Sequence, residues 1–360
     1  MSLENTIAVV LNGNAKQVTT SMIDHFKRLS KDRLRLFISH SLSEAKEHAH
    51  AILEERHAFL YCVGGDGTIY HKWNILNQVR EETKMSQPLP TLALQKGGTG
   101  NALASVVGAT KAVNQLDKLL FYDDLSRLPT KEVPLIEVSL PSDSARKAHT
   151  FFAGTGWDAA VVNGYNEFKQ NHSGPWQRWY SHGLLGYLLS VGFHTIPRLV
   201  KADHLPRADI ICNSGVLYRI GQRDFHESDR VALPPSNNLS EIHPQPINAI
   251  LAGTVPFFGF KFRAFPYASL AAQQNLMQLR VVVGEPKRTI PHLVLHAGSI
   301  WRGTYRGSRI EDYFTNDVTL QYHRPEAFQI AGDAKGCEQT IRYRISGEKM
   351  KLVDWRKVDL

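Results

Sequence analysis

Residues 58–68 read Ala-Phe-Leu-Tyr-Cys-Val-Gly-Gly-Asp-Gly-Thr, an apolar run that leads directly into a glycine-rich segment with one acidic residue. The apolar run has the length and composition of a buried strand, and the pattern after it predicts a helix from about Ile69 to Arg80. Glycines let a loop approach a ligand closely, and backbone amides at a helix N-terminus bind anions. The segment therefore predicts a phosphate loop between a strand and a helix.

Asp66 is the unexpected residue of this loop, because a carboxylate repels phosphate. A divalent cation that bridges the two removes the repulsion, so we predict that Asp66 acts on nucleotide phosphates through Mg²⁺, by way of a water molecule. An ordinary strand-to-helix turn, with Asp66 near the helix cap, is the alternative that the residues leave open. The residues expected to bind phosphate are Gly64, Gly65, Asp66, Gly67 and Thr68.

The same alternation of apolar runs and amphipathic stretches extends from residue 7 to about 130. Strand-like runs occupy Ile7–Leu11, Leu34–Ile38 and Thr91–Leu94, and a helical stretch follows each of them. Strands that alternate with helices favour a doubly wound parallel sheet. We expect residues 1–130 to form this α/β nucleotide-binding domain, with its ligand at the loops that follow the strands.

Two of these loops resemble the first in composition. Residues 96–104 read Lys-Gly-Gly-Thr-Gly-Asn-Ala-Leu-Ala, and residues 11–16 read Leu-Asn-Gly-Asn-Ala-Lys. Loops at neighbouring strand ends can hold one ligand from several sides, although each loop taken alone is also compatible with an ordinary turn. The candidate nucleotide-binding residues in them are Asn12, Lys16, Gly98, Thr99, Gly100 and Asn101.

From residue 131 onward the pattern changes to short apolar runs separated by turn residues, which favours an antiparallel β-sandwich. The predicted strands include Leu293–Leu295, and one helical segment interrupts them from about Trp176 to Leu199. We expect residues 131–360 to form this second domain, with the last strands, about 326–360, returning to the domain junction. The fold class is thus α/β plus β.

Composition and charge limit the partners and the cellular location that we expect for this protein. The 360 residues carry a formal net charge of +8 at pH 7, so anionic partners are expected. The start of the chain lacks the basic segment of a signal peptide, and the longest apolar run, Leu184–Phe193, is too short to cross a membrane. Three widely spaced cysteines indicate neither disulfides nor a zinc site. A cytoplasmic location is therefore expected.

The three loops, in this order along the chain, resemble the diacylglycerol kinase catalytic-domain family, which includes bacterial lipid kinases, sphingosine kinases and ceramide kinase. Later segments extend the resemblance over most of the chain. Gly154–Ala159 resembles the glycine-rich start of the family's second domain, Phe257–Pro266 resembles another of its segments, and Phe328–Asp333 stands where the family carries Gln-x-Asp-Gly-Glu. The first glycine loop is the most specific of these matches.

The resemblance implies an enzyme that uses ATP and Mg²⁺ to phosphorylate the hydroxyl of a lipid alcohol, of the diacylglycerol or sphingoid-base type. It implies that Ser39 and Thr99 contact the nucleotide and that Asp333 accepts the proton of the hydroxyl. Asp158 is a competing acid-base candidate, expected near the substrate. Because Ala331-Gly332-Asp333 replaces the family's Asp-Gly-Glu, one carboxylate is missing and the base is one methylene shorter.

This departure keeps open a nucleotide-binding protein of the same fold with impaired catalysis. An NAD kinase, which shares the first glycine loop, is a separate alternative. Gly154-x-Gly156-x-x-Ala159 also matches a dinucleotide-binding fingerprint, but we expect no long helix to begin there.

The expected partners are the lipid substrate, an anionic membrane surface and a second copy of the chain in a homodimer, but no nucleic acid. Aromatic residues lie beside basic ones in residues 176–180, 197–201 and 257–265, a mixture that suits transient membrane docking. The aromatic residues of these segments are equally compatible with the core of the β domain.

Overall fold

The computed structural model describes residues 6–15, 18–29, 33–98, 100–112, 115–141, 143–172, 174, 183–200, 206–214, 216–220, 231–232 and 245–358. The chain forms two compact units. The first contains residues 1–133 and 348–360, and the second contains residues 134–347. The chain therefore leaves the first unit once and returns to it for its last residues.

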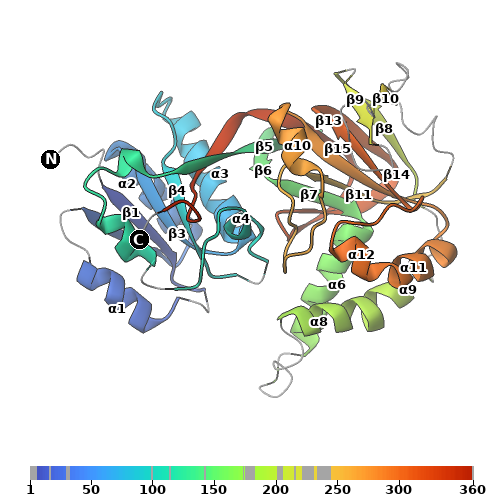
Figure 1. Ribbon diagram of the computed structural model, residues 1–360, viewed down its shortest axis with the longest axis horizontal. Helices are drawn as coiled ribbons and strands as arrows, with labels where there is room; N and C mark the ends of the chain where they lie inside the picture. The colour runs from blue at the N-terminus through green and yellow to red at the C-terminus, as the bar shows by residue number, and fades with distance from the viewer. Residues whose placement is uncertain are drawn as a thin grey trace. The chain divides into compact units, whose positions relative to one another are not determined.

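The first unit is built on a parallel sheet with the strand order β2-β1-β3-β4 (Figure 1). Every residue of β3 is buried, because its uninterrupted apolar run can face helices on both sides of the sheet. This arrangement confirms the predicted parallel α/β fold. The strands are β1 (Ile7–Asn12), β2 (Leu34–Ser39), β3 (Phe59–Gly64) and β4 (Thr91–Lys96).

The helices of this unit follow the strands along the chain. Alternate residues of β1, among them Val9 and Leu11, pack in one core cluster with Phe26 and Leu116. The residues between them, such as Ala8, are buried as well and face the other side of the sheet. The helices are α1 (Thr20–Leu29), α2 (Leu42–Glu54), α3 (Asp66–Glu82), α4 (Ala102–Val106) and α5 (Gln115–Leu120).

The end of the chain completes the first unit. The last residues of β15 (Asp333–Val353) run parallel to β4, where Leu352 pairs with Leu92. Leu352 is fully buried, and the indole Nε1 of Trp355 donates a hydrogen bond to the carbonyl oxygen of Leu94 at 3.0 Å. The α/β unit thus depends on residues that follow the whole β-rich unit in the sequence.

The second unit consists of antiparallel strands in the order β10-β9-β13-β12-β11-β7-β14-β15, which confirms the predicted change of strand direction. A hairpin of β5 and β6 adds to β15, and β8 adds to β14. The strands are β5 (Thr130–Leu140), β6 (Asp143–Thr150), β7 (Phe152–Gly156), β8 (Ala208–Cys212), β9 (Leu217–Arg219), β10 (Val231–Ala232), β11 (Ile247–Gly253), β12 (Met277–Val283), β13 (Ile310–Thr315) and β14 (Asp317–Ile330).

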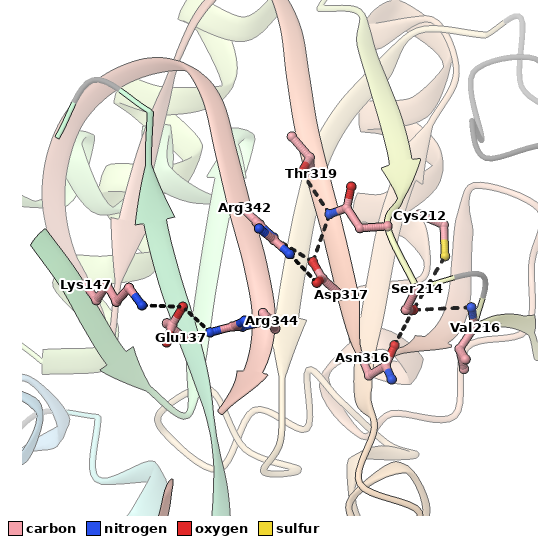
Figure 2. Close-up of polar contacts among 11 residues, drawn as sticks. Glu137, Lys147, Cys212, Ser214, Val216, Asn316, Asp317, Thr319, Arg342 and Arg344 are labelled. Carbon is pink, nitrogen blue, oxygen red and sulfur yellow. Dashed lines mark hydrogen bonds and ion pairs between the residues drawn. The ribbon is translucent and has the colours of Figure 1, made fainter. Parts of the chain in front are cut away.

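Strand β14 changes neighbours along its length. Its residues 318–322 pair with β8, and residues 328–330 pair with β7. Its register against β15 shifts between Gln321 and Glu326, an irregularity of the kind that bends a strand. Figure 2 shows ion pairs near the first half of β14, where Arg342 of β15 donates from Nε to Asp317 at 2.9 Å and Arg344 binds Glu137 of β5 at 2.9 Å. These pairs tie β5, β14 and β15 together.

Helices cover part of this unit, and two of them differ from the sequence prediction. The segment Leu293–Leu295 is not a strand but the end of α11, since a run of three apolar residues does not distinguish the two periodicities. A long helix does begin at Trp157, directly after the glycines of β7. The helices are α6 (Trp157–Asn171), α8 (Gly183–Ser190), a π-helical turn (Val191–Thr195), α9 (Ile196–Val200), α10 (Ala268–Gln273), α11 (Pro286–Leu295) and α12 (Ala297–Trp301).

The predicted helical segment from about 176 to 199 is helical from residue 183 onward, and residues 176–182 lie outside the described residues. In the part of the chain that the structure describes, no helix combines the length and hydropathy needed to cross a membrane.

Candidate functional site

Asp66 is the first residue of α3 and holds two loops of the α/β unit together. Its side chain is buried, and its carboxylate accepts the backbone N–H of Ala102 at 2.8 Å and that of Leu103 at 3.2 Å. Burial raises the pKa of Asp66 to about 6, although the two amide hydrogen bonds oppose the shift. The carboxylate of the first glycine loop thus caps α4, the helix that follows the second.

The two glycine loops also touch through their backbones. The N–H of Gly97 donates to the carbonyl oxygen of Gly64 at 3.0 Å. A Cβ atom added to Gly98 would lie 2.3 Å from the Cα of Gly65, closer than any side chain tolerates. Glycine is therefore required at this crossing because the chains pass without room for a side chain. The structure thus places the first loop, at Gly64, Gly65 and Asp66, against the second loop, which contains Gly98.

Asn101 shapes the second loop. It adopts a left-handed backbone conformation with a φ of 56°, which asparagine tolerates better than most residues. Its side-chain Oδ1 accepts the N–H of Gly98 at 3.1 Å, and its Nδ2 donates to the carbonyl oxygen of the same glycine. This pair of hydrogen bonds closes the loop on itself. Gly100 lies inside the closed turn, and Thr99 lies outside the described residues.

The Asn-rich loop follows β1 and rests on the end of β2. The N–H of Gly13 donates to the carbonyl oxygen of Ser39 at 2.9 Å, and the hydroxyl of Ser39 donates to the carbonyl oxygen of Leu11 at 3.3 Å. Asn12 accepts the N–H of Asn14 at 3.0 Å. Parallel strands end at one edge of a sheet, so this loop and the two glycine loops share that edge. Lys16 lies outside the described residues.

Magnesium was predicted at Asp66, and the geometry tests how well this residue fits. Each carboxylate oxygen already accepts one backbone amide, and the side chain is buried, so only its remaining lone pairs could face a cation. Among the described residues, no three His, Cys, Asp or Glu side chains gather as a metal site. Asp66 is thus placed as a helix cap, and its contact with Mg²⁺ through water stays a prediction.

In the β-rich unit, Gln329 connects Asp158 to the turn before Asp333. Its Nε2 donates to Oδ2 of Asp158 at 2.8 Å, and its Oε1 accepts the N–H of Gly332 at 2.7 Å. Gly154 makes room for this contact, since a Cβ there would lie 1.8 Å from the Asp158 carboxylate. Burial raises the pKa of Asp158 to about 7, against the effect of the Gln329 hydrogen bond. Asp158 can therefore gain or lose a proton near neutral pH.

The turn itself is a tight two-residue hairpin. Ile330 of β14 pairs with Asp333 of β15, and the two residues between them, Ala331 and Gly332, have φ angles of 51° and 83°. The side chain of Asp333 is 39% exposed, with the Nζ of Lys335 at 3.9 Å from its Oδ2. Asp333 is thus accessible to a substrate, in contrast to Asp66.

Two functional candidates escaped the sequence analysis. Gln329 stands in the segment that resembles the family motif, so the motif itself was the signal that could have identified it. Tyr343 gave no such signal: its side chain is fully buried, and its hydroxyl has no hydrogen-bond partner among the described residues. Burial raises the pKa of Tyr343, and the charges of Tyr322 and Asp158 raise it further. Asp158 therefore lies near the buried polar side chains of Tyr322 and Tyr343.

Comparison with known protein families finds a match for the α/β part of the chain. Residues 6–130 match the model of the diacylglycerol kinase catalytic domain. The resemblance to this family is confirmed. The region matched to the diacylglycerol kinase model contains the three loops at the sheet edge and ends at the first residue of β5. Asp158, Gln329 and Asp333 lie beyond it.

Solved structures extend the diacylglycerol kinase fold to the whole chain. The structure of a diacylglycerol kinase from Bacillus anthracis str. Sterne is similar, with a TM-score of 0.58 and 12% sequence identity, over 99% of this chain and 98% of that chain. A second structure, described as a "putative diacylglycerol kinase" of the same strain, has a TM-score of 0.60 and 12% identity over 98% of both chains. At this identity the match establishes the fold. A comparison with curated protein sequences finds no significant match.

Proposed function

We propose that this protein is an ATP-dependent lipid kinase that transfers the γ-phosphate of ATP to the hydroxyl of a lipid alcohol. The observation that supports it best is the contact between the two glycine loops, where Gly65 and Gly98 touch and Asp66 caps α4. This contact lies within the region that matches the diacylglycerol kinase catalytic domain. The family implies a lipid kinase of the cytoplasm, and the arrangement of the loops agrees with a phosphate-binding role.

The α/β unit would bind ATP at the edge where its parallel strands end. Backbone N–H groups of a glycine loop and of the first turn of a helix form an anion site, and Gly67 and Thr68 occupy that turn of α3. Asn12 and Ser39 at the same edge would contact the rest of the nucleotide, together with Lys16 and Thr99. Mg²⁺, when bound, would neutralise phosphate charge.

Asp333 is the proposed proton acceptor. The hydroxyl of the lipid passes its proton to the carboxylate, its oxygen forms a bond to the γ-phosphorus, and the bond to the bridging oxygen of ADP breaks. Exposure of the Asp333 side chain suits a group that must reach a substrate. Asp158 would contact the acceptor from the same unit, since Gln329 links it to the turn that carries Asp333.

The acceptor class is proposed as diacylglycerol or a sphingoid base. The Gly100-Asn-Ala-Leu-Ala104 segment resembles the sphingosine-kinase version of the second loop, which favours the sphingoid base slightly. Transfer to a panel of lipids decides between the two.

Ala331 favours a second candidate function, a nucleotide-binding protein with impaired catalysis. The family carries an aspartate where this chain has Ala331, whose side chain is buried at 3% exposure. Loss of that carboxylate would leave ATP binding in the α/β unit intact and remove transfer.

Transfer of labelled γ-phosphate from ATP and Mg²⁺ to lipids in mixed detergent micelles tests the proposal. The panel contains diacylglycerol, monoacylglycerol, sphingosine, ceramide and phosphatidylglycerol, with NAD in a separate reaction. A labelled lipid that depends on the protein supports the kinase and names its acceptor class. Label on NAD alone would make the protein an NAD kinase, and ATP binding without any transfer would favour the impaired nucleotide-binding protein.

A further inference from the structure

The helix α11 has an outward face that is basic at one end and apolar at the other. Its buried residues are Pro286, Thr289 and Ile290. The opposite face carries Lys287 and Arg288 in the first turn and Val294 and Leu295 at the end of the helix, at spacings that place them on one side. Val294 is 58% exposed and Leu295 is 81% exposed. Two large aliphatic side chains are therefore exposed to solvent on the same side of α11 as two basic residues.

The loop between β11 and α10 adds cations next to α12, the helix that follows α11. Phe260 and Lys261 both have positive φ angles, 49° and 60°, and form the tip of a tight turn in which Gly259 bridges to Phe262. Phe262 stacks on Trp301 of α12 with ring centroids 5.3 Å apart. The two stacked rings are half-buried, and Lys261 is exposed.

Arg263 and Arg302 are exposed beside this turn, and the N–H of Arg263 donates to the carbonyl oxygen of Trp301 at 3.0 Å. Within the described part of the chain, Lys261, Arg263, Lys287 and Arg302 have no ion pair. The turn and α12 therefore present a group of cations that no described carboxylate neutralises.

The part of the chain that contains these elements carries many more basic than acidic residues. Residues 245–310 contain eight Lys and Arg residues and a single acidic residue, Glu285, whereas the whole chain has a net charge of +8. One of the eight, Arg280, is buried and paired with Asp312, so it does not add to the surface charge. A surface with exposed aliphatic side chains and excess cations fits an anionic bilayer, whose headgroups attract the cations and whose interface accepts the side chains. A nucleic-acid partner would explain the cations but not the two exposed aliphatic side chains.

We propose that the outward face of α11, the turn at residues 259–263 and α12 form a docking surface for anionic lipid bilayers. Val294 and Leu295 enter the interface, while Lys261, Arg263, Lys287 and Arg302 lie over the headgroups. The inference rests on the proposed function for the reason why this protein visits a bilayer. It differs from the sequence prediction for residues 257–265, because Phe265 is buried, Phe262 is half-buried against Trp301, and the exposed apolar side chains come from α11.

Sedimentation with vesicles of phosphatidylcholine alone, or with phosphatidylglycerol added, tests this surface without ATP or substrate. We expect binding only to the anionic vesicles, weakened by high salt. Val294→Ser with Leu295→Ser, and separately Lys261→Glu with Lys287→Glu, should each weaken binding at least ~10-fold. The matched controls are Leu42→Ser, an aliphatic residue of the other unit that is 66% exposed, and Lys351→Glu with Lys357→Glu.

Equal binding to neutral and anionic vesicles, no binding to either, or equal loss in the control variants would overturn the docking surface. Thermal unfolding of each variant checks that it is folded. Activity in detergent micelles separates the two proposals. Micelle activity without vesicle binding overturns the surface alone, and salt-sensitive vesicle binding without lipid phosphorylation overturns the kinase alone.

Discussion

The carboxylate of Asp66 accepts the backbone N–H of Ala102 at 2.8 Å, across 36 positions of sequence. Through this bond the first glycine loop fixes the start of the helix that follows the second. The carboxylate predicted to face a metal ion thus has a direct role in holding the proposed phosphate-binding edge in shape. Both the stability of the α/β unit and its affinity for ATP should depend on it.

Asp66→Ala removes both acceptors and leaves two buried amides at the start of α4 unpaired. We expect a loss of about 2–3 kcal/mol in the free energy of unfolding. Asp66→Asn keeps one acceptor oxygen and should lose less. Urea unfolding measures both variants, and an alanine variant as stable as the asparagine variant would contradict the capping role.

The crossing of the two glycine loops predicts a sharp difference between two Gly→Ala substitutions. Gly98→Ala forces a Cβ against Gly65. It should lower the free energy of unfolding by about 1–3 kcal/mol and weaken ATP binding. Gly347→Ala is the matched control, because no atom lies within 4 Å of its added Cβ. Equilibrium ATP binding and unfolding of both variants are the measurements. Unchanged ATP affinity in Gly98→Ala would contradict the joint cradle.

The pH dependence of stability should report Asp158. Burial raises its pKa to about 7 in the folded protein, above the value of about 4 expected in the unfolded chain. Between these values the folded protein binds more protons, so this group lowers stability as pH rises from 4 to 7, by up to about 1.4 kcal/mol per pH unit. Asp158→Asn should flatten that slope. Unfolding at pH 5, 6, 7 and 8 compares the two proteins, and parallel curves would exclude a raised pKa.

The hairpin at Ala331 allows a test of whether the carboxylate that the family carries at this position increases the rate of phosphate transfer. Both turn residues have positive φ angles, a conformation that suits Asp-Gly and Asn-Gly pairs and costs alanine roughly 1 kcal/mol. Ala331→Asp and Ala331→Asn should therefore fold at least as well as the natural protein. We expect only the aspartate variant to increase the rate of phosphate transfer. Equal rates in both variants would show that a carboxylate at this position is irrelevant.

The sequence predicted the strands of the α/β unit because each was a short, largely apolar run, and glycine or asparagine follows three of the four within a few residues. It predicted that two glycine loops share one edge, which the parallel order of β3 and β4 confirms. It could not reveal the bond from Asp66 to Ala102, because a cap supplied by a distant residue leaves no local pattern.

The β-rich unit was less accessible to prediction. Leu293–Leu295 lies in a helix that Pro286 starts, and Val294 and Leu295 face outward rather than into a core. The link from Asp158 through Gln329 to Gly332 depends on β14 lying beside β7, a pairing between residues more than 170 positions apart. The resemblance pointed to the right segment, but the partners within it appear only in the folded chain.

Single-turnover transfer from labelled ATP to the preferred lipid, in the natural protein and in Asp333→Asn, tests whether the protein is a lipid kinase with Asp333 as its base. ATP affinity is measured in parallel for both. We expect rapid labelling of the lipid by the natural protein, and loss of at least about 100-fold in Asp333→Asn with ATP affinity unchanged. If the natural protein binds ATP but labels no lipid, it is not a lipid kinase. If Asp333→Asn transfers phosphate at the natural rate, another group accepts the proton.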